Sequence, residues 1–469
     1  MCGFATMLLL GSCGMYQKYE RPSRVVPNGL YQKAAKSSGK GEGLKGNLKI
    51  DSALDSLDKN ENFGTQPWRN LFTSLRLQAL IERALANNTD LQVARFRIAE
   101  AEASFSASRK AFLPSLVFTP QGTVSSFGGE KATQTYSLPL QASWQVDIFG
   151  RLRNAKEQTR MQLESSKAYR QAVRTQLIAS VAREYYHLSL FRSQLNITEQ
   201  TREVWKENVR AMKAFMNEGL YTDAAVSQAE ANYQQVCTSV LDLKREISES
   251  ENSICNLLGE VSNEVKTEDL TEWKSITEYS AGVPLSLLSL RPDVRQAEQN
   301  LASAFYATSE ARSAFYPSLT LSGNAGWANS SGIIVNPGKL LLEAIGSIIQ
   351  PIFQNGRLQA NLKIAQAQQE EAKLNFRQAL LNAGMEVNNA LTQVQTYRQK
   401  THHLESQIAS LEHTVRSTKL LQQEGSSSYL EVLTAQESLL SARLSLLQNQ
   451  YDEIASFIAL YQALGGGRE

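Results

Sequence analysis

An internal duplication constrains the fold of this sequence more than any other feature. Asp90 opens a segment that ends in Pro-Ser-Leu at Leu116, and Asp293 opens a second that ends in the same three residues at Leu319, an offset of 203 residues in both cases. Three glycine landmarks recur at an offset of 206 residues: Gly150 with Gly356, Gly219 with Gly425 and Gly259 with Gly465. The two halves therefore share one architecture, and the three extra residues of the second half fall in a loop before its Gly-Arg landmark.

Each half has the pattern of a mainly α-helical unit. Prolines at 114 and 317 end the first helical pattern of each half. The patterns that follow the Gly-Arg pairs contain no proline and are exceptionally long, roughly 100 Å at 1.5 Å per residue. A turn containing glycine then leads into a last helix. The predicted helices cover about residues 90–112, 151–217, 223–259, 293–315, 357–423 and 429–463.

The predicted helix over residues 223–259 carries a coiled-coil pattern. Its apolar positions step by three and four residues in strict alternation, which places them on one helix face. The positions are Val226, Ala229, Tyr233, Val236, Val240, Leu243, Ile247, Ser250, Ile254 and Leu257. The counterpart in the second half keeps this pattern from Val432 to Leu446. The pattern predicts a helix-packing core.

Apolar and polar residues alternate with a period of two between the first and second helices of each half. The alternation is clear from Tyr136 to Ile148 and weaker from Leu319 to Trp327, so we expect β-hairpins over 115–148 and 318–353. About 12 residues of such alternation fit a membrane strand, which needs roughly 9 to 11 residues when tilted. The sequence thus predicts four strands in the chain. The alternative is the edge of a soluble β-sandwich.

Four membrane strands cannot close a barrel, and lipid does not tolerate an open sheet edge. Known small barrels begin at about eight strands, so either two copies or three copies of the chain would supply enough strands to close a barrel. Aromatic residues near the strand ends fit the interfacial girdles of such barrels; they are Phe112, Phe118, Trp144, Phe149, Phe315, Tyr316 and Trp327. The strands therefore predict an oligomer and leave dimer and trimer open.

The amino terminus has the pattern of a bacterial lipoprotein leader. Residues 4–10 form an apolar run too short to span a bilayer, and Leu10-Gly11-Ser12-Cys13 has the order of a lipobox. We expect a signal peptide over residues 1–12 and a covalent diacylglycerol and acyl anchor on Cys13, because several chains on one residue hold a protein firmly in a membrane. No Lys or Arg precedes the apolar run, so an ordinary signal peptide and a start further upstream are alternatives.

The sequence contains no motif of an enzyme, a metal site or a nucleic-acid-binding protein. The formal net charge is +2, from 48 basic and 46 acidic residues. This balance does not indicate a nucleic-acid partner, because nucleic-acid-binding proteins carry an excess of basic residues. His402, His403 and His413 lie on one predicted helix without the His-Glu-x-x-His spacing. Cys237 and Cys255 would lie about 27 Å apart on a helix, beyond the roughly 7 Å that a disulfide spans. We expect no catalysis, no metal and no cofactor apart from the lipid.

The lipobox, the twofold order of helix, hairpin and long helix, the Pro-Ser-Leu entry to each hairpin and the Gly-Arg return together resemble the outer-membrane factors of tripartite efflux pumps, the TolC and OprM channels. The resemblance covers about residues 63–465. It implies a homotrimer with a twelve-stranded transmembrane β-barrel and an α-barrel tunnel in the periplasm. It also implies a lipid-anchored protein of the outer membrane, with a periplasmic adaptor and an inner-membrane transporter as partners.

This resemblance sets the expected domain organisation. In the family, the amino-terminal arm and the linker between the repeats wrap the middle of the tunnel. The expected segments are the lipidated arm 13–62, the first repeat 63–259, the linker 260–284, the second repeat 285–465 and the tail 466–469.

The resemblance places the gate and the adaptor-binding surface at the turns after the long helices. The corresponding residues here are Gly219, Asp223, Gly425, Tyr429 and Glu431. Glu431 stands where TolC-like channels carry a gate aspartate, whereas Thr434 replaces the second carboxylate of that motif and Ala225 fills the acidic position of the first turn. Three copies of Glu431 would attract cations. The alternative is that these carboxylates are solvated helix ends with capping roles.

The resemblance predicts the outer-membrane channel of a tripartite (RND-type) efflux system, a passive exit duct for drugs and small solutes. The exit duct of a type I protein-secretion system would share this architecture and is the alternative within transport. A soluble coiled-coil scaffold is a third hypothesis. The lipobox favours the first, because lipidated members are more similar to OprM than to TolC.

Overall fold

The computed structural model describes residues 17–22, 66–126, 128–129, 132–219, 221–270, 291–329, 339–424 and 429–467, without the side chains of residues 423 and 429. These residues form two compact units. The first contains Arg95–Tyr169 and Arg295–Ala379 with residues 17–22, and the second contains residues 66–94, Arg170–Val294 and Leu380–Glu469. The predicted signal peptide, Cys13 and most of the arm and the linker lie outside the described residues.

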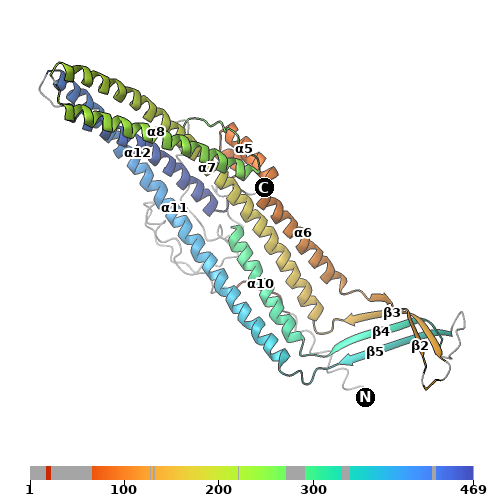
Figure 1. Ribbon diagram of the computed structural model, residues 1–469. Helices are drawn as coiled ribbons and strands as arrows, with labels where there is room; N and C mark the ends of the chain where they lie inside the picture. Colours follow the sequence, from red (N-terminus) through yellow and green to blue (C-terminus); the bar gives the residue numbers. More distant parts are fainter. Residues whose placement is uncertain are drawn as a thin grey trace, which may run out of the picture. The chain divides into compact units, whose positions relative to one another are not determined.

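The described chain is mostly helical, with antiparallel strands, as the sequence predicts at this coarse level. The helices are α4 (Trp68–Leu71), α5 (Leu75–Asn87), α6 (Thr89–Lys110), α7 (Arg151–Asn217), α8 (Asp223–Leu258), α10 (Pro292–Ser313), α11 (Arg357–Gln423) and α12 (Tyr429–Ala463) (Figure 1). Both long helices, α7 and α11, end at the residues expected. None of the helices in the described ranges is long and apolar enough to cross a membrane.

The first helix of each half ends two residues before the predicted boundary, because its last turn tightens ahead of the proline. Leu113 N donates to Lys110 O at 2.9 Å, and Tyr316 N donates to Ser313 O at 3.1 Å. Hydrogen bonds between residues three apart belong to a 3₁₀ turn, which commonly closes an α-helix. The regular α-helices therefore stop at Lys110 and Ser313.

The Gly-Arg landmarks mark the sharp entries into the long helices. Gly150 has φ of 75° and Gly356 has φ of 76°, a left-handed conformation that glycine adopts without strain. Ahead of α7, Asp147 accepts hydrogen bonds from Leu152 N at 3.1 Å and Arg153 N at 2.9 Å. The carboxylate thus satisfies two free N–H groups at the positive end of the helix dipole.

The predicted helices do not include α5 as a separate element. Ser74 caps it by accepting a hydrogen bond from Leu77 N, and Asn88 separates it from α6, where Asn88 Oδ1 accepts from Leu91 N at 3.1 Å. Leu77 and Ile81 are fully buried in the main core of the second unit. This short amphipathic helix therefore belongs to the core and is not part of the arm.

The predicted coiled-coil stripe of α8 is confirmed. Most of its positions are buried and the rest are half-buried, whereas the residues between them are mainly exposed. Gly259 closes the helix with φ of 68°. A Cβ at this glycine would come within 3.1 Å of Asn87 O, so the close approach of α5 and the end of α8 favours glycine.

The sheet has the order β1-β3-β4-β5, and β2 also pairs with β3. The strands are β1 (Ser115–Phe118), β2 (Gln121–Ser125), β3 (Thr133–Val146), β4 (Ser318–Asn329) and β5 (Lys339–Ile349). The prediction of four strands is wrong in number, since the described sheet has five. The first expected strand divides at Pro120, which has no N–H to donate to the ladder. The sheet remains four strands wide.

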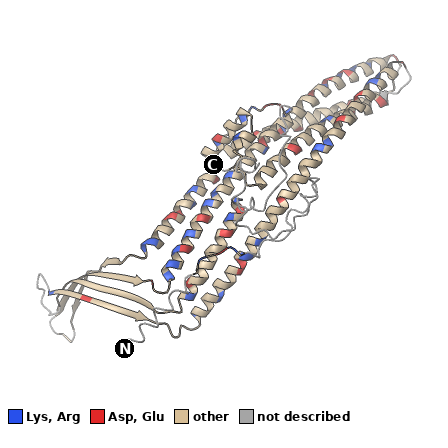
Figure 2. Cartoon of the chain, turned by 180° about the vertical axis from the view of Figure 1, so that it is seen from behind, with Lys and Arg blue, Asp and Glu red and all other residues tan. Residues whose placement is uncertain are grey.

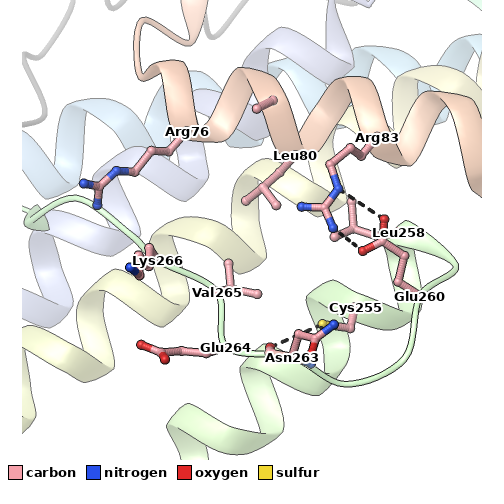
Figure 3. Close-up of a pocket in the computed structure, with 11 residues that line it drawn as sticks. Arg76, Leu80, Arg83, Cys255, Leu258, Glu260, Asn263, Glu264, Val265 and Lys266 are labelled. Atoms are coloured by element: carbon pink, nitrogen blue, oxygen red, sulfur yellow. Dashed lines mark hydrogen bonds and ion pairs between the residues drawn. The ribbon is translucent and has the colours of Figure 1, made fainter.

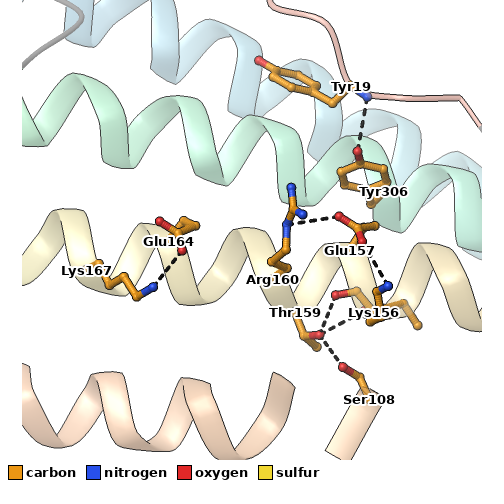
Figure 4. A network of polar contacts seen from close by, with 10 residues as sticks. Tyr19, Ser108, Lys156, Glu157, Thr159, Arg160, Glu164, Lys167 and Tyr306 are labelled. Carbon is orange, nitrogen blue, oxygen red and sulfur yellow. Dashed lines mark hydrogen bonds and ion pairs between the residues drawn. The ribbon is translucent and has the colours of Figure 1, made fainter. Parts of the chain in front are cut away.

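Polar contacts and a small apolar cluster hold the helices of the first unit together (Figure 4). Ser108 of α6 and Thr159 of α7 share a hydrogen bond of 2.7 Å. Tyr306 of α10 packs with Met161 of α7 and with Tyr19, whose backbone N–H donates to the Tyr306 hydroxyl at 3.3 Å. Residues 17–22 therefore bind to this helical layer.

Candidate functional site

The sheet of the first unit has two chemically different faces. Strand register brings the apolar residues of β3, β4 and β5 into rows, such as Trp144 beside Leu321 and Leu138 beside Trp327. Several of these side chains are exposed, including Leu342 at 71% and Trp327 at 50%. The apolar face comprises Leu138, Leu140, Ala142, Trp144, Val146, Leu319, Leu321, Gly323, Ala325, Trp327, Leu340, Leu342, Ala344, Gly346 and Ile348. An exposed apolar face of this extent needs a nonpolar neighbour.

The opposite face of the sheet is mostly polar. Gln141 lies opposite Asn324, and Asn324 lies opposite Glu343, so polar groups cross three strands in one row. Within the described strands the charged residues are Lys339 and Glu343, both on this face, whereas the helices carry charges along their length (Figure 2). Alternation of this kind is typical of a strand between lipid and an aqueous lumen.

Both edges of the described sheet are open. Strands β1 and β2 pair only with β3, and β5 pairs only with β4. Each edge strand therefore presents unpaired backbone N–H and C=O groups on its outer side.

The first tip, residues 218–223, contains two of the predicted site residues. Gly219 adopts φ of 80° and follows the end of α7. Thr222 then caps α8 by accepting a hydrogen bond from Ala225 N at 3.3 Å. Asp223 is exposed and is the first residue of α8. Its carboxylate thus lies at the positive end of the helix dipole, where a negative charge is favourable.

The second tip, residues 424–431, is described only in part. Gly425 lies outside the described residues, and Tyr429 is described only as the first residue of α12. Glu431 is exposed in the first turn of that helix. Its carboxylate thus lies near the positive end of the helix dipole, as the cap and dipole roles require.

The helices that flank the two tips meet in one apolar cluster of the second unit. Leu433 of α12 is 3% exposed and packs with Met212 of α7 and Val226 of α8. Gln422 Nε2 of α11 donates to the Tyr221 hydroxyl at 2.6 Å. The structure therefore couples the helical hairpin α7 and α8 to the hairpin α11 and α12 (Figure 1).

Three residues of this junction were missed by sequence reasoning: Tyr221, Gln422 and Leu433. Their contacts join residues about two hundred positions apart, which periodicity along one helix cannot reveal. For Tyr221 a signal was available, because an aromatic residue inside a polar turn indicates a packing contact.

A separate pocket of about 310 Å³ lies between α5, the end of α8 and the segment after it (Figure 3). Its apolar floor includes Leu80 and Val265. At its rim Arg83 forms a two-pronged ion pair with Glu260, and Arg76 donates to Thr267 O at 2.8 Å. Arg76 and Arg83 thus already have hydrogen-bond partners within the chain.

Cysteine and histidine side chains are the other chemically reactive groups of the described residues. Cys255 is buried and Cys237 is half-buried, and both are free thiols. In the described part of the chain, no group of three or more His, Cys, Asp or Glu side chains is placed to hold a metal ion. His402, His403 and His413 are exposed on α11.

Comparison with known proteins identifies the family. The family model described as outer membrane efflux protein matches residues 80–260 and 283–466. The cation efflux system protein CusC of Escherichia coli K12 is 30% identical and covers 99% of this chain and 98% of its own. SilC of Salmonella typhimurium, named as a probable outer membrane lipoprotein, is 27% identical over 100% of this chain and 98% of its own. The solvent efflux pump outer membrane protein SrpC of Pseudomonas putida is 28% identical over 98% and 97%.

The fold comparison agrees with the sequence comparison. A crystal structure of CusC superposes with a TM-score of 0.83 at 29% identity, and it covers 96% of this chain and 99% of that one. The resemblance drawn from the duplicated motifs is thereby confirmed. The chain belongs to the outer membrane efflux protein family.

Proposed function

We propose that three copies of this chain form the exit duct of a tripartite efflux system, through which drugs and small solutes leave the cell without being chemically changed. The observation that carries the proposal is the two-faced sheet with two open edges. In lipid, backbone groups on an open edge would have no partner, so such a sheet has to close on itself or on further copies.

The width of the sheet supports three copies. A single sheet four strands wide is too narrow to enclose a lumen, because known barrels begin at about eight strands. The family to which the chain belongs favours closure with three sheets over closure with two. In the closed barrel the apolar face meets lipid and the polar face lines the lumen.

Exposed apolar side chains on the helices support an α-barrel as a second part of the duct. Exposed apolar residues recur on α11, among them Ile364 at 55%, Leu374 at 63% and Leu420 at 62%. In one isolated copy these side chains would face water. Neighbouring copies would cover them and complete the wall of a periplasmic tunnel.

A lipid on Cys13 would anchor the duct in the outer membrane. The lipobox motivates this step, and the relative SilC is itself named as a probable lipoprotein. Residues 17–22 follow the proposed anchor closely and bind the first unit, where Arg21 pairs with Glu298 through hydrogen bonds of 2.6 and 2.5 Å. Loss of acyl labelling in Cys13→Ala is the expected result, and unchanged labelling would contradict the anchor.

The tips are the proposed contact with a periplasmic adaptor, which in turn joins an inner-membrane transporter. Gly219 and Asp223 from the first tip and Gly425, Tyr429 and Glu431 from the second provide this surface. Glu431 is also the proposed gate residue. Asp223 and Glu431 are both exposed in the first turns of their helices, on the surface proposed to meet the adaptor.

The relatives are named for the efflux of cations and of solvents. The proposed substrates of this chain are small solutes of these kinds and drugs. Deleting the chain is expected to raise susceptibility to antibiotics, bile salts or metal cations. Unchanged susceptibility to all three, together with lost export of large proteins, would favour the secretion duct. Release into aqueous buffer without detergent would favour the soluble scaffold over a trimer that fractionates with the outer membrane.

A further inference from the structure

Glu343 lies near the middle of β5, on the polar face of the sheet. Its chain neighbours Leu342 and Ala344 belong to the apolar face, and side chains of a strand alternate between faces. The residue directly opposite is Asn324 of β4, whose own partner on β3 is Gln141. A carboxylate therefore stands at the end of a row of amides, in strands that otherwise carry almost no charge.

A hydrogen bond from a neutral amide orients the carboxylate of Glu343. Asn324 Nδ2 donates to Glu343 Oε2 at 3.1 Å. An amide has no charge of its own, so it fixes the direction of the carboxylate without cancelling it. The side chain of Glu343 is exposed on its face of the sheet.

The other charge on the described strands is too far along β5 to form an ion pair with this carboxylate. Lys339 lies four residues from Glu343, which corresponds to about 13 Å along a strand at about 3.3 Å per residue. At physiological salt the Debye length is about 8 Å. Salt therefore screens most of the interaction between Lys339 and Glu343.

We propose that Glu343 gives the β-barrel part of the duct a preference for cations. This inference rests on the proposed function, because only a closed trimer brings three copies of the polar face around one lumen. Three carboxylates at one level attract cations and repel anions, as acidic rings do in cation channels. Substitutions on the lumen side of a barrel alter its selectivity, so the residue acts in the barrel and independently of the tips.

Reversal potentials in planar bilayers test the inference. The detergent-extracted trimer would be reconstituted under a KCl gradient, with wild type expected to favour K⁺. Glu343→Gln should lower the permeability ratio of cations to anions roughly two- to fivefold at low ionic strength, and the difference should fade near about 1 M salt, where the Debye length is about 3 Å. Glu343→Asp should keep most of the preference, and Lys339→Gln should increase it.

Charge restoration separates an electrostatic role from a structural one. Glu343→Cys should lose the preference, regain it with an anionic thiol reagent and reverse it with a cationic one, whereas the same reagents should leave wild type unchanged. The effect of Glu343→Gln should persist in a Glu431→Gln background. An unchanged ratio in Glu343→Gln would overturn the inference while leaving the duct intact; a wild-type protein that forms no conducting trimer would overturn the proposed function as well.

Discussion

Among the glycines of the sheet, Gly326 has the least room for a side chain. A Cβ at this position would lie 2.2 Å from Leu138 O and 2.7 Å from Pro139 Cα, so the β3 backbone itself is in the way. We expect Gly326→Ala to destabilise the sheet by roughly 1–3 kcal/mol, the usual range for overpacking, and to reduce the yield of heat-resistant oligomer from membranes. Gly346→Ala is the matched control, because its Cβ would meet only Leu321 Cδ2 at 3.6 Å. Equal yields from both variants would contradict this account.

His187 predicts a pH dependence of stability. It lies on α7 between the rings of Phe191 and Tyr451, and burial lowers its pKa, a shift that Glu184 and Glu246 only partly oppose. The unfolded chain, with an ordinary histidine pKa of about 6.5, then binds the proton more readily than the folded chain. Stability should therefore fall as the pH drops below about 6.5.

Thermal unfolding at several pH values measures this effect of His187. The decrease of the midpoint between neutral pH and about pH 5 should be smaller in His187→Gln than in wild type. His413→Gln replaces an exposed histidine of α11 and serves as the control. A pH profile of His187→Gln that parallels wild type would show that other groups cause the decrease.

At the scale of elements, the junction of the helical hairpins holds the ends of α7, α8 and α12 together. Leu433 fills the cluster between α7, α8 and α12, and truncating a buried leucine to alanine costs about 2–5 kcal/mol. We expect Leu433→Ala to loosen the tips, raise channel conductance in planar bilayers and sensitise cells to large antibiotics. Leu430→Ala, at a side chain that is 60% exposed, should change neither. The prediction fails if the two variants behave alike.

The elements show what sequence reasoning could and could not reach. The long helices were predictable because their boundaries are local, with left-handed glycines before them and a capping threonine at the start of α8. The division of the first strand was missed, although Pro120 has no backbone N–H and was a local signal for it. Tyr221 and Leu433 were missed because their partners come from the other repeat, and no local pattern encodes such packing.

At the scale of the whole molecule, the same substitution should have opposite effects on the two faces of the sheet. Leu342 lies on the apolar face and Leu341 on the polar face of the same strand, and both are exposed in one copy. If three sheets close in the membrane, position 342 faces lipid and position 341 faces the lumen. A soluble scaffold would place both side chains in water and make them equivalent.

Lysine substitutions therefore distinguish a membrane barrel from a soluble sheet. Leu342→Lys should place a charge in lipid, at a cost of about 2–4 kcal/mol per copy near the bilayer centre, and should prevent assembly of the outer-membrane trimer. Leu341→Lys adds the same residue one position away, where water can solvate it, and should still assemble. Membrane fractionation and heat-resistant migration on gels measure both outcomes. If Leu342→Lys assembled as well as Leu341→Lys, the apolar face would not be the lipid-facing surface, because three uncompensated charges in hydrocarbon would outweigh the strand pairing gained at each new edge.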